Sequence, residues 1–100
     1  MYELKESGDA SYERIVEFPI WDEYAKLLES TIADLKNIGG REAGAITAGK
    51  FLEKFTDYPW IHMDIAGPSF LFAEDGYRTP GGTGTGVRLL IEFIKKHYIN

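Results

Sequence analysis

The sequence has no cysteine among its 100 residues, which excludes disulfide bonds and thiolate metal sites and fits a reducing compartment, so cytoplasmic location is expected. It also lacks a run of about 18 apolar residues and a signal peptide's apolar stretch near its start, so neither membrane spanning nor secretion is supported. Basic residues are scattered except for Lys95 and Lys96, and the net charge is −5. We therefore expect no nucleic-acid partner and no membrane partner.

What the sequence does contain is an excess of apolar side chains for its length. Apolar residues make up 44% and aromatic residues 14%, which excludes a disordered tail. A chain of this size hides only about two thirds of its surface on folding, so its core is modest. The surplus suggests missing neighbours, and we treat residues 1–100 as one incomplete domain that begins with a polar lead-in over 1–11.

The stretch over residues 59–67 predicts the central element of the fold. It shows no helical stripe and is rich in aromatic and β-branched residues, as is typical of an inner strand buried on both faces. Alternation places Trp60, His62, Asp64 and Ala66 on one face. Two polar groups on that face then need hydrogen-bond partners.

Helical periodicity predicts three helices, over residues 21–32, 43–55 and 87–98. The stripe of the last helix is the most regular, and Arg88 with Glu92 forms a four-residue pair on its exposed side. In the middle helix Lys50, Glu53 and Lys54 are expected to form a narrow solvent-exposed edge. Residues 1–11 are expected to be a loop, broken at Ser7-Gly8-Asp9.

His62 and Asp64 raise the possibility of a metal site, because imidazole and carboxylate at a spacing of two point the same way on a strand. No third potential ligand lies nearby in the sequence. This favours a structural role, in which His62 on the strand is held by a backbone carbonyl or by Asp64. His97, near the end of a surface helix, is expected to be solvated. A small metal-binding protein using His62 and Asp64 stays open as an alternative.

The glycine-rich opening of the last helix, over residues 81–86, has a phosphate-binding alternative, since a helix N-terminus attracts anions. It lacks the lysine of a P-loop and the spacing of a dinucleotide fingerprint. Close backbone packing, or an N-terminal cap by Thr83 or Thr85, is favoured instead. Ser69 lies outside any nucleophile elbow and lacks an evident base.

Five segments in order resemble the C-terminal end of the leucyl aminopeptidases, the cytosol aminopeptidase family M17. They cover residues 14–24, 33–39, 43–52, 60–67 and 82–90. The run His-x-Asp-Ile-Ala-Gly, followed by Gly-x-Thr-Gly-x-x-Val-Arg-Leu-Leu, is the most specific part of the match. Gly49 departs from the family, where alanine is usual.

The resemblance implies the C-terminal part of a three-layer α/β/α mixed-sheet domain, zinc-exopeptidase-like, with about three helices and one or two inner strands. It implies a hydrolase that uses two divalent metal ions, zinc or manganese, to release N-terminal residues from peptides, and that assembles as a homohexamer. The family's metal-binding and catalytic motifs have no counterpart in this sequence, so the chain is expected to hold no catalytic residue and no metal ligand. It should be inactive without the rest of the catalytic domain.

What the resemblance carries over is the substrate pocket. Ala66 and Ser69 correspond to residues that line the pocket for the substrate's first side chain, and Ile38 lies near the site for the next residue. Small residues at the end of an inner strand would leave room for a ligand there. The alternative from another class is a stand-alone interaction or scaffold domain derived from the same fold.

Overall fold

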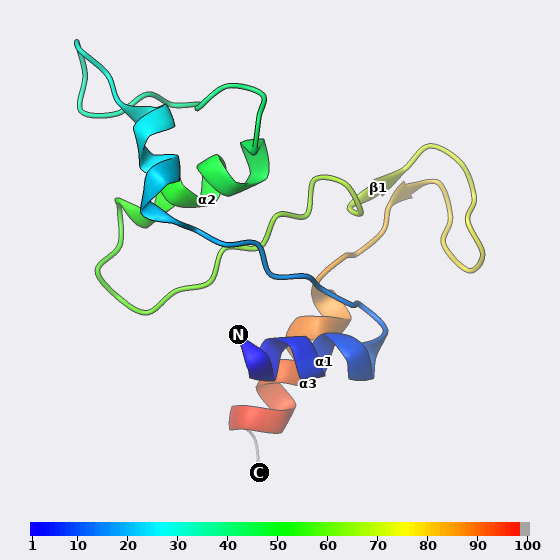
Figure 1. Cartoon of the computed structure of the whole chain (residues 1–100). Helices are drawn as coiled ribbons and strands as arrows, with labels where there is room; N and C mark the ends of the chain where they lie inside the picture. Colours follow the sequence, from blue (N-terminus) through cyan, green and yellow to red (C-terminus); the bar gives the residue numbers. More distant parts are fainter. Residues whose placement is uncertain (99–100) are drawn as a thin grey trace. The chain divides into compact units, whose positions relative to one another are not determined.

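The computed structural model describes residues 1–98, which fall into two compact units (Figure 1). Phe18–His62 form the central unit, and Met1–Glu17 together with the residues from Met63 onward form the terminal unit. In chain order the elements are helix α1 (Tyr2–Ser11), the 3-10 helix η1 (Asp22–Leu28), helix α2 (Gly44–Glu53), strands β1 (Phe70–Leu71) and β2 (Gly81–Gly82), and helix α3 (Val87–Tyr98).

Helix α3 of the terminal unit confirms the helix predicted over the end of the chain. Its buried residue is Leu89, which is only 1% exposed and lies on the side that packs on α1. The apolar stripe seen in the sequence stays exposed instead, so α3 has two apolar sides and α1 covers one of them. The exposed members are Val87, Leu90, Ile91, Ile94 and Tyr98.

Residues 2–11 form helix α1, so the predicted loop is wrong. The helix ends in a Schellman motif: Tyr12 takes the left-handed conformation, and the N–H of Glu13 donates to the Gly8 carbonyl at 2.8 Å. Gly8 lies inside the helix rather than breaking it. A Cβ atom there would meet the Glu13 carbonyl oxygen at 2.7 Å, so the backbone that follows the helix requires glycine, and it would also meet Leu89 Cδ1 of α3 at 3.3 Å. Figure 1 shows α1 lying against α3.

Polar contacts of α3 with residues 3–13 correct two expectations about α3. His97 is not fully solvated, because its Nδ1 lies 3.9 Å from Glu3 Oε1 and its Nε2 is buried without a partner among the described residues. Lys96 Nζ lies 3.7 Å from Glu6 Oε2. Arg88 pairs with Glu13 rather than with the predicted Glu92.

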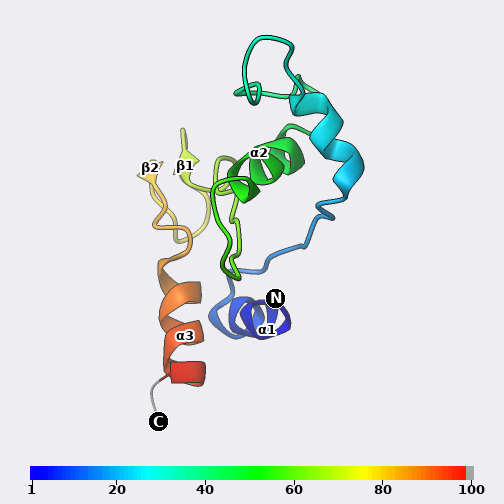
Figure 2. The same ribbon diagram turned by 90° about the vertical axis from the view of Figure 1, so that its left-hand side faces the viewer.

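The only sheet in the described part of the chain is an antiparallel pair of two-residue strands, with Phe70 opposite Gly82 and Leu71 opposite Gly81 (Figure 2). Residues 59–65 are irregular, so the predicted inner strand is wrong. A strand needs a neighbour to accept and donate its backbone hydrogen bonds, and neither unit offers one there. The aromatic and β-branched composition of residues 59–65 is that of a strand whose pairing partner lies outside the described residues.

The central unit is built from η1 and α2, and α2 confirms the helix predicted over this region. The first predicted helix is instead a 3-10 helix, η1, with Leu28 completely buried. Gly39 packs closely, since a Cβ atom there would lie 3.1 Å from Thr47 and 3.2 Å from Leu27. Glycine at this position therefore allows the loop before α2 to lie close to both α2 and η1.

Lys50 on α2 is 3% exposed, so the polar edge predicted for it is wrong. Its Nζ donates to Glu53 Oε1 and to Asp22 Oδ1, each at 3.0 Å, and joins α2 to η1. The hydrogen bonds to Glu53 and then Asp22 raise the Lys50 pKa above its ordinary value of 10.5, against the opposing effect of burial. Both carboxylates reach solvent, which limits the stabilisation from these pairs to about 1 kcal/mol.

We expect this contribution to be fully present below pH 10.5 and to disappear as the pH rises through the raised pKa of Lys50. Lys50→Met keeps most of the apolar stem but removes the charge. It should lower stability by about 1 kcal/mol at neutral pH and remove part of the alkaline loss. Urea denaturation at several pH values checks this, with Lys54→Met, at an exposed position of the chain, as the control. Equal effects of the two substitutions would contradict the expectation.

Candidate functional site

The candidate pocket residues Ala66 and Ser69 lie on one tight turn of the terminal unit. Asp64 Oδ1 accepts a hydrogen bond from the Ala66 N–H at 2.9 Å, which is an Asx turn, and the Ser69 N–H donates to the Ile65 carbonyl at 3.1 Å. Ala66 and Gly67 are exposed, and a Cβ atom on Gly67 would meet nothing within 4 Å. The turn therefore presents small residues beside open space.

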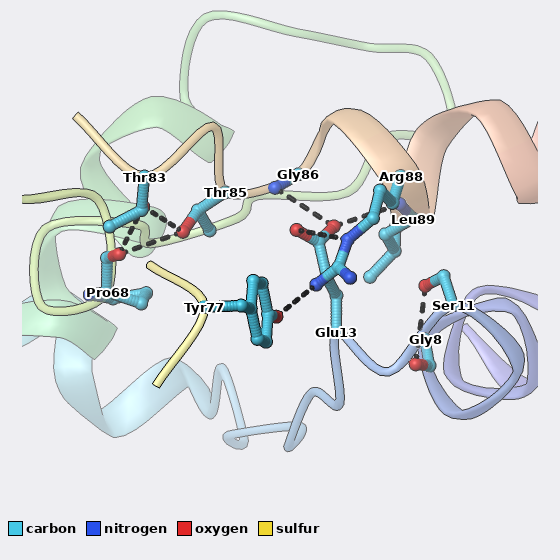
Figure 3. A network of polar contacts seen from close by, with 10 residues as sticks. All are labelled: Gly8, Ser11, Glu13, Pro68, Tyr77, Thr83, Thr85, Gly86, Arg88 and Leu89. Carbon is cyan, nitrogen blue, oxygen red and sulfur yellow. Dashed lines mark hydrogen bonds and ion pairs between the residues drawn. The ribbon is translucent and has the colours of Figure 1, made fainter. Parts of the chain in front are cut away.

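Two threonine hydroxyls fasten this turn from the segment before α3 (Figure 3). Thr83 Oγ1 donates to the Pro68 carbonyl at 2.6 Å, Thr85 Oγ1 donates to the same oxygen at 2.9 Å, and the two hydroxyls lie 2.8 Å apart. The Thr83 N–H also donates to the Ser69 carbonyl at 2.9 Å. The expected cap of the helix by Thr83 or Thr85 is therefore wrong, because both side chains point to Pro68.

The N-terminus of α3 is capped by Glu13, a residue that the sequence did not single out. Its Oε2 accepts hydrogen bonds from the N–H groups of Leu89 at 2.9 Å and Gly86 at 3.2 Å, and its Oε1 lies 3.6 Å from Arg88 Nε (Figure 3). The carboxylate therefore takes the place that a phosphate would need. Arg88 also donates to the Tyr77 hydroxyl at 2.9 Å and so links the loop between β1 and β2 to this network.

Ile38, the third candidate pocket residue, belongs to the central unit and is exposed. The terminal unit brings Ala66 and Ser69 together on one turn, whereas neither unit by itself brings Ile38 together with them. Sequence pattern could identify all three only through resemblance. No local signal marks Glu13, because its hydrogen-bond partners are 73 and 76 residues away in the chain.

The proposed metal ligands take other roles in the structure. Asp64 closes the Asx turn at Ala66. The imidazole of His62 packs within the central unit, edge-on to Trp60 with ring centroids 6.2 Å apart, and its Cδ2 lies 3.3 Å from where a Cβ atom on Gly49 would stand. Across residues 1–98 no group of three or more histidine, aspartate or glutamate side chains could hold a metal ion.

Two pairs of packed helices, α1 with α3 and η1 with α2, together with a short two-stranded sheet, are typical of a piece of a larger α/β domain. The chain belongs to the cytosol aminopeptidase family: the model of the family's catalytic domain matches residues 1–91. This shows the family that the order of the five segments indicated.

Curated relatives agree with the family match. Proteins named "Probable cytosol aminopeptidase" are 54% identical over 92 residues in Chlorobaculum tepidum, 50% over 93 residues in Geotalea uraniireducens and 47% over 95 residues in Clostridium perfringens. The matches cover 90%, 92% and 94% of this chain but only 18% or 19% of the relatives. The chain thus spans less than a fifth of their length and corresponds to a C-terminal segment.

A solved structure confirms the predicted α/β fold class. A mutant of tomato leucine aminopeptidase matches with a TM-score of 0.83 at 33% identity, over 96% of this chain and 18% of that one. The described residues therefore have the conformation of the corresponding part of a much longer chain. The missing partner of residues 59–65 and the small core are both consistent with such a segment.

Proposed function

We propose that this chain forms part of the catalytic domain of a metal-dependent aminopeptidase that releases N-terminal amino acids from peptides. Ala66 and Ser69 line the pocket for the first side chain of the substrate, and Ile38 lies near the site for the next residue. The observation that carries this proposal is the turn over residues 64–69, which presents Ala66 and Gly67 to open space and belongs to a chain that matches the family's catalytic domain. The protein would act in the cytoplasm.

The two divalent ions of the proposed enzyme, zinc or manganese, do not fit the side chains of residues 1–98. Two-metal sites need several carboxylate or imidazole ligands close together, and this part of the chain offers no group of three. Asp64, the carboxylate within the turn over residues 64–69, already accepts a hydrogen bond from the Ala66 N–H. We therefore propose that the rest of the catalytic domain supplies the ligands and that this chain alone does not hydrolyse peptides.

The partner of this chain is then the rest of the catalytic domain, in an enzyme that we propose to be a homohexamer. The apolar residues that are fully buried in the described structure are Leu4, Leu28 and Leu89. Large apolar side chains remain exposed on α3, on α2 and in the irregular segments. Exposed apolar surface on this scale marks contact with another polypeptide surface.

A chimeric enzyme tests the proposal. The 100-residue chain replaces the matching segment of the Chlorobaculum tepidum aminopeptidase, and hydrolysis of leucine amide is measured with the metal ions present. We expect kcat/KM within about tenfold of the parent, while the parent lacking the segment and the free 100-residue chain are both inactive. A folded but inactive chimera, or activity of the free chain, would contradict the proposal.

Substitution within the chimera tests the pocket residues separately. Ser69→Leu adds volume to the pocket wall and should lower kcat/KM for leucine amide about tenfold more than for alanine amide, because only the larger side chain reaches the added atoms. Ser30→Leu, in the irregular segment before α2, is the matched control and should change both substrates equally. Equal effects of Ser69→Leu on both substrates would remove Ser69 from the pocket.

A further inference from the structure

The carbonyl of Pro68 receives two hydroxyl groups, an arrangement that the aminopeptidase assignment does not explain. Three distances define it: 2.6 Å from Thr83 Oγ1, 2.9 Å from Thr85 Oγ1, and 2.8 Å between the hydroxyl oxygens. Pro68 has no N–H, so this carbonyl is its only backbone hydrogen-bonding group. Figure 3 shows both threonines directed at it.

Counting hydrogens shows that the two threonines act as a pair. Each hydroxyl has one hydrogen and can accept as well as donate, so at most two of the three contacts are hydrogen bonds at any moment. Either both hydroxyls donate to Pro68, or one donates to Pro68 and accepts from the other. In every arrangement at least one hydroxyl holds the carbonyl, so removal of one threonine weakens the contact and removal of both abolishes it.

The hydroxyls of Thr83 and Thr85, which we call the threonine clamp, hold the turn over residues 64–69, the pocket turn, to a segment that is itself anchored. The Thr83 N–H donates to the Ser69 carbonyl at 2.9 Å, so two successive carbonyls of the turn are bound to residues 83–85. Gly84, between the threonines, has φ +71°, a conformation that favours glycine. One residue beyond Thr85, Gly86 donates to the Glu13 carboxylate, which fixes the start of α3.

We propose that Thr83 and Thr85 are positioning residues that set the depth of the pocket for the substrate's first side chain, by holding the turn that carries Ala66 and Ser69. This rests on the proposed function of those two residues. Side-chain preference requires the position of the pocket wall to be fixed to within about half an ångström, because contacts weaken steeply when a gap opens. If the wall is free to retreat, the leucine side chain of the substrate loses contacts with it. The alanine side chain is too short to reach the wall and is not affected.

The chimeric enzyme provides the test. Thr83→Val with Thr85→Val, which keeps the shape but removes both hydroxyls, should lower the ratio of kcat/KM for leucine amide to that for alanine amide about tenfold, mainly through KM for leucine amide. Each single valine variant should lower it only about twofold, and the double serine variant should restore it. Thr79→Val, at an exposed position of the same unit, is the control and should leave the ratio unchanged.

The substrate ratio does not depend on how much enzyme is folded, so a purely structural loss of activity would leave it constant. An active double valine variant with an unchanged ratio would overturn the proposal. If that variant is inactive, the single variants decide: a twofold fall in the ratio for either one supports the clamp, and unchanged ratios for both overturn it. An inactive chimera without substitutions would instead reject the proposed function.

Discussion

Leu89→Ala should lower the free energy of unfolding of the terminal unit by about 3 kcal/mol, a far larger loss than at any exposed position of the same helix. Leu89 is 1% exposed at the contact between α1 and α3. Its Cδ1 lies 3.3 Å from the position of a Cβ atom on Gly8, in a notch that only glycine leaves open. Shortening this side chain removes its apolar contacts and leaves a cavity against α1. Urea denaturation followed by far-ultraviolet circular dichroism measures the loss.

Leu90→Ala is the matched control, because the same atoms are removed one position along the same helix from an exposed side chain. It should cost less than about 1 kcal/mol. The same pair in the chimeric enzyme is expected to behave differently, since the rest of the catalytic domain would cover Leu90 and raise the cost of its substitution. Equal costs of Leu89→Ala and Leu90→Ala in the 100-residue chain would contradict the packing of α1 on α3.

Glu13→Ala should release the start of α3. The carboxylate is largely buried, with 14% of the side chain exposed, and accepts hydrogen bonds from the backbone of Gly86 and Leu89. Loss of these two charge-assisted hydrogen bonds should cost about 2 kcal/mol, since no other acceptor replaces the carboxylate. Hydrogen exchange over residues 84–92, read by mass spectrometry, should then become about 30-fold faster.

Two variants define what this result would mean. Glu13→Gln keeps an acceptor but loses the charge that the helix N-terminus attracts, so it should have a smaller effect, on the order of 0.5 kcal/mol. Glu17→Ala removes a carboxylate from an exposed position of the same unit and should leave the exchange rates unchanged. If Glu13→Ala changed the exchange rates as little as Glu17→Ala, the Glu13 cap would not stabilise the start of α3.

Of the three helices predicted from helical spacing, the structure confirms two, α2 and α3, whereas the first is the 3-10 helix η1. Helix α1 was missed because its sequence has little apolar periodicity and includes Gly8. It is stabilised by packing of its few buried residues on α3 and by the Schellman motif at Tyr12. Neither feature has a periodic signature, so a polar composition suggested a loop.

The error over residues 59–67 has the opposite cause. The composition and alternation of a segment indicate the environment in which it folds, and those of residues 59–67 indicate a buried strand. A strand forms only when a neighbour pairs with it, and the described part of this chain does not supply one. The pattern is informative about the longer protein and misleading about the isolated segment.

Ala66, Ser69 and Ile38 are candidates for the site only through the resemblance of the sequence to the family, and the sequence also showed two threonines before α3. It could not show that Thr83 and Thr85 hold Pro68, because those partners are 15 and 17 residues apart in the chain. It also could not show that Lys50 would be buried between two carboxylates. Side chains of the same types on a solvated face would have the same sequence pattern.

The sequence by itself determined the family and the two periodic helices, because each depends on residue types and their spacing along the chain. Tertiary structure alone decided which groups meet across long separations: Glu13 with the start of α3, Leu89 with Gly8, and the threonine pair with the Pro68 carbonyl. The physical reason is that hydrogen bonds and close packing act over a few ångströms in space. Only the folded backbone determines which distant residues come within that range.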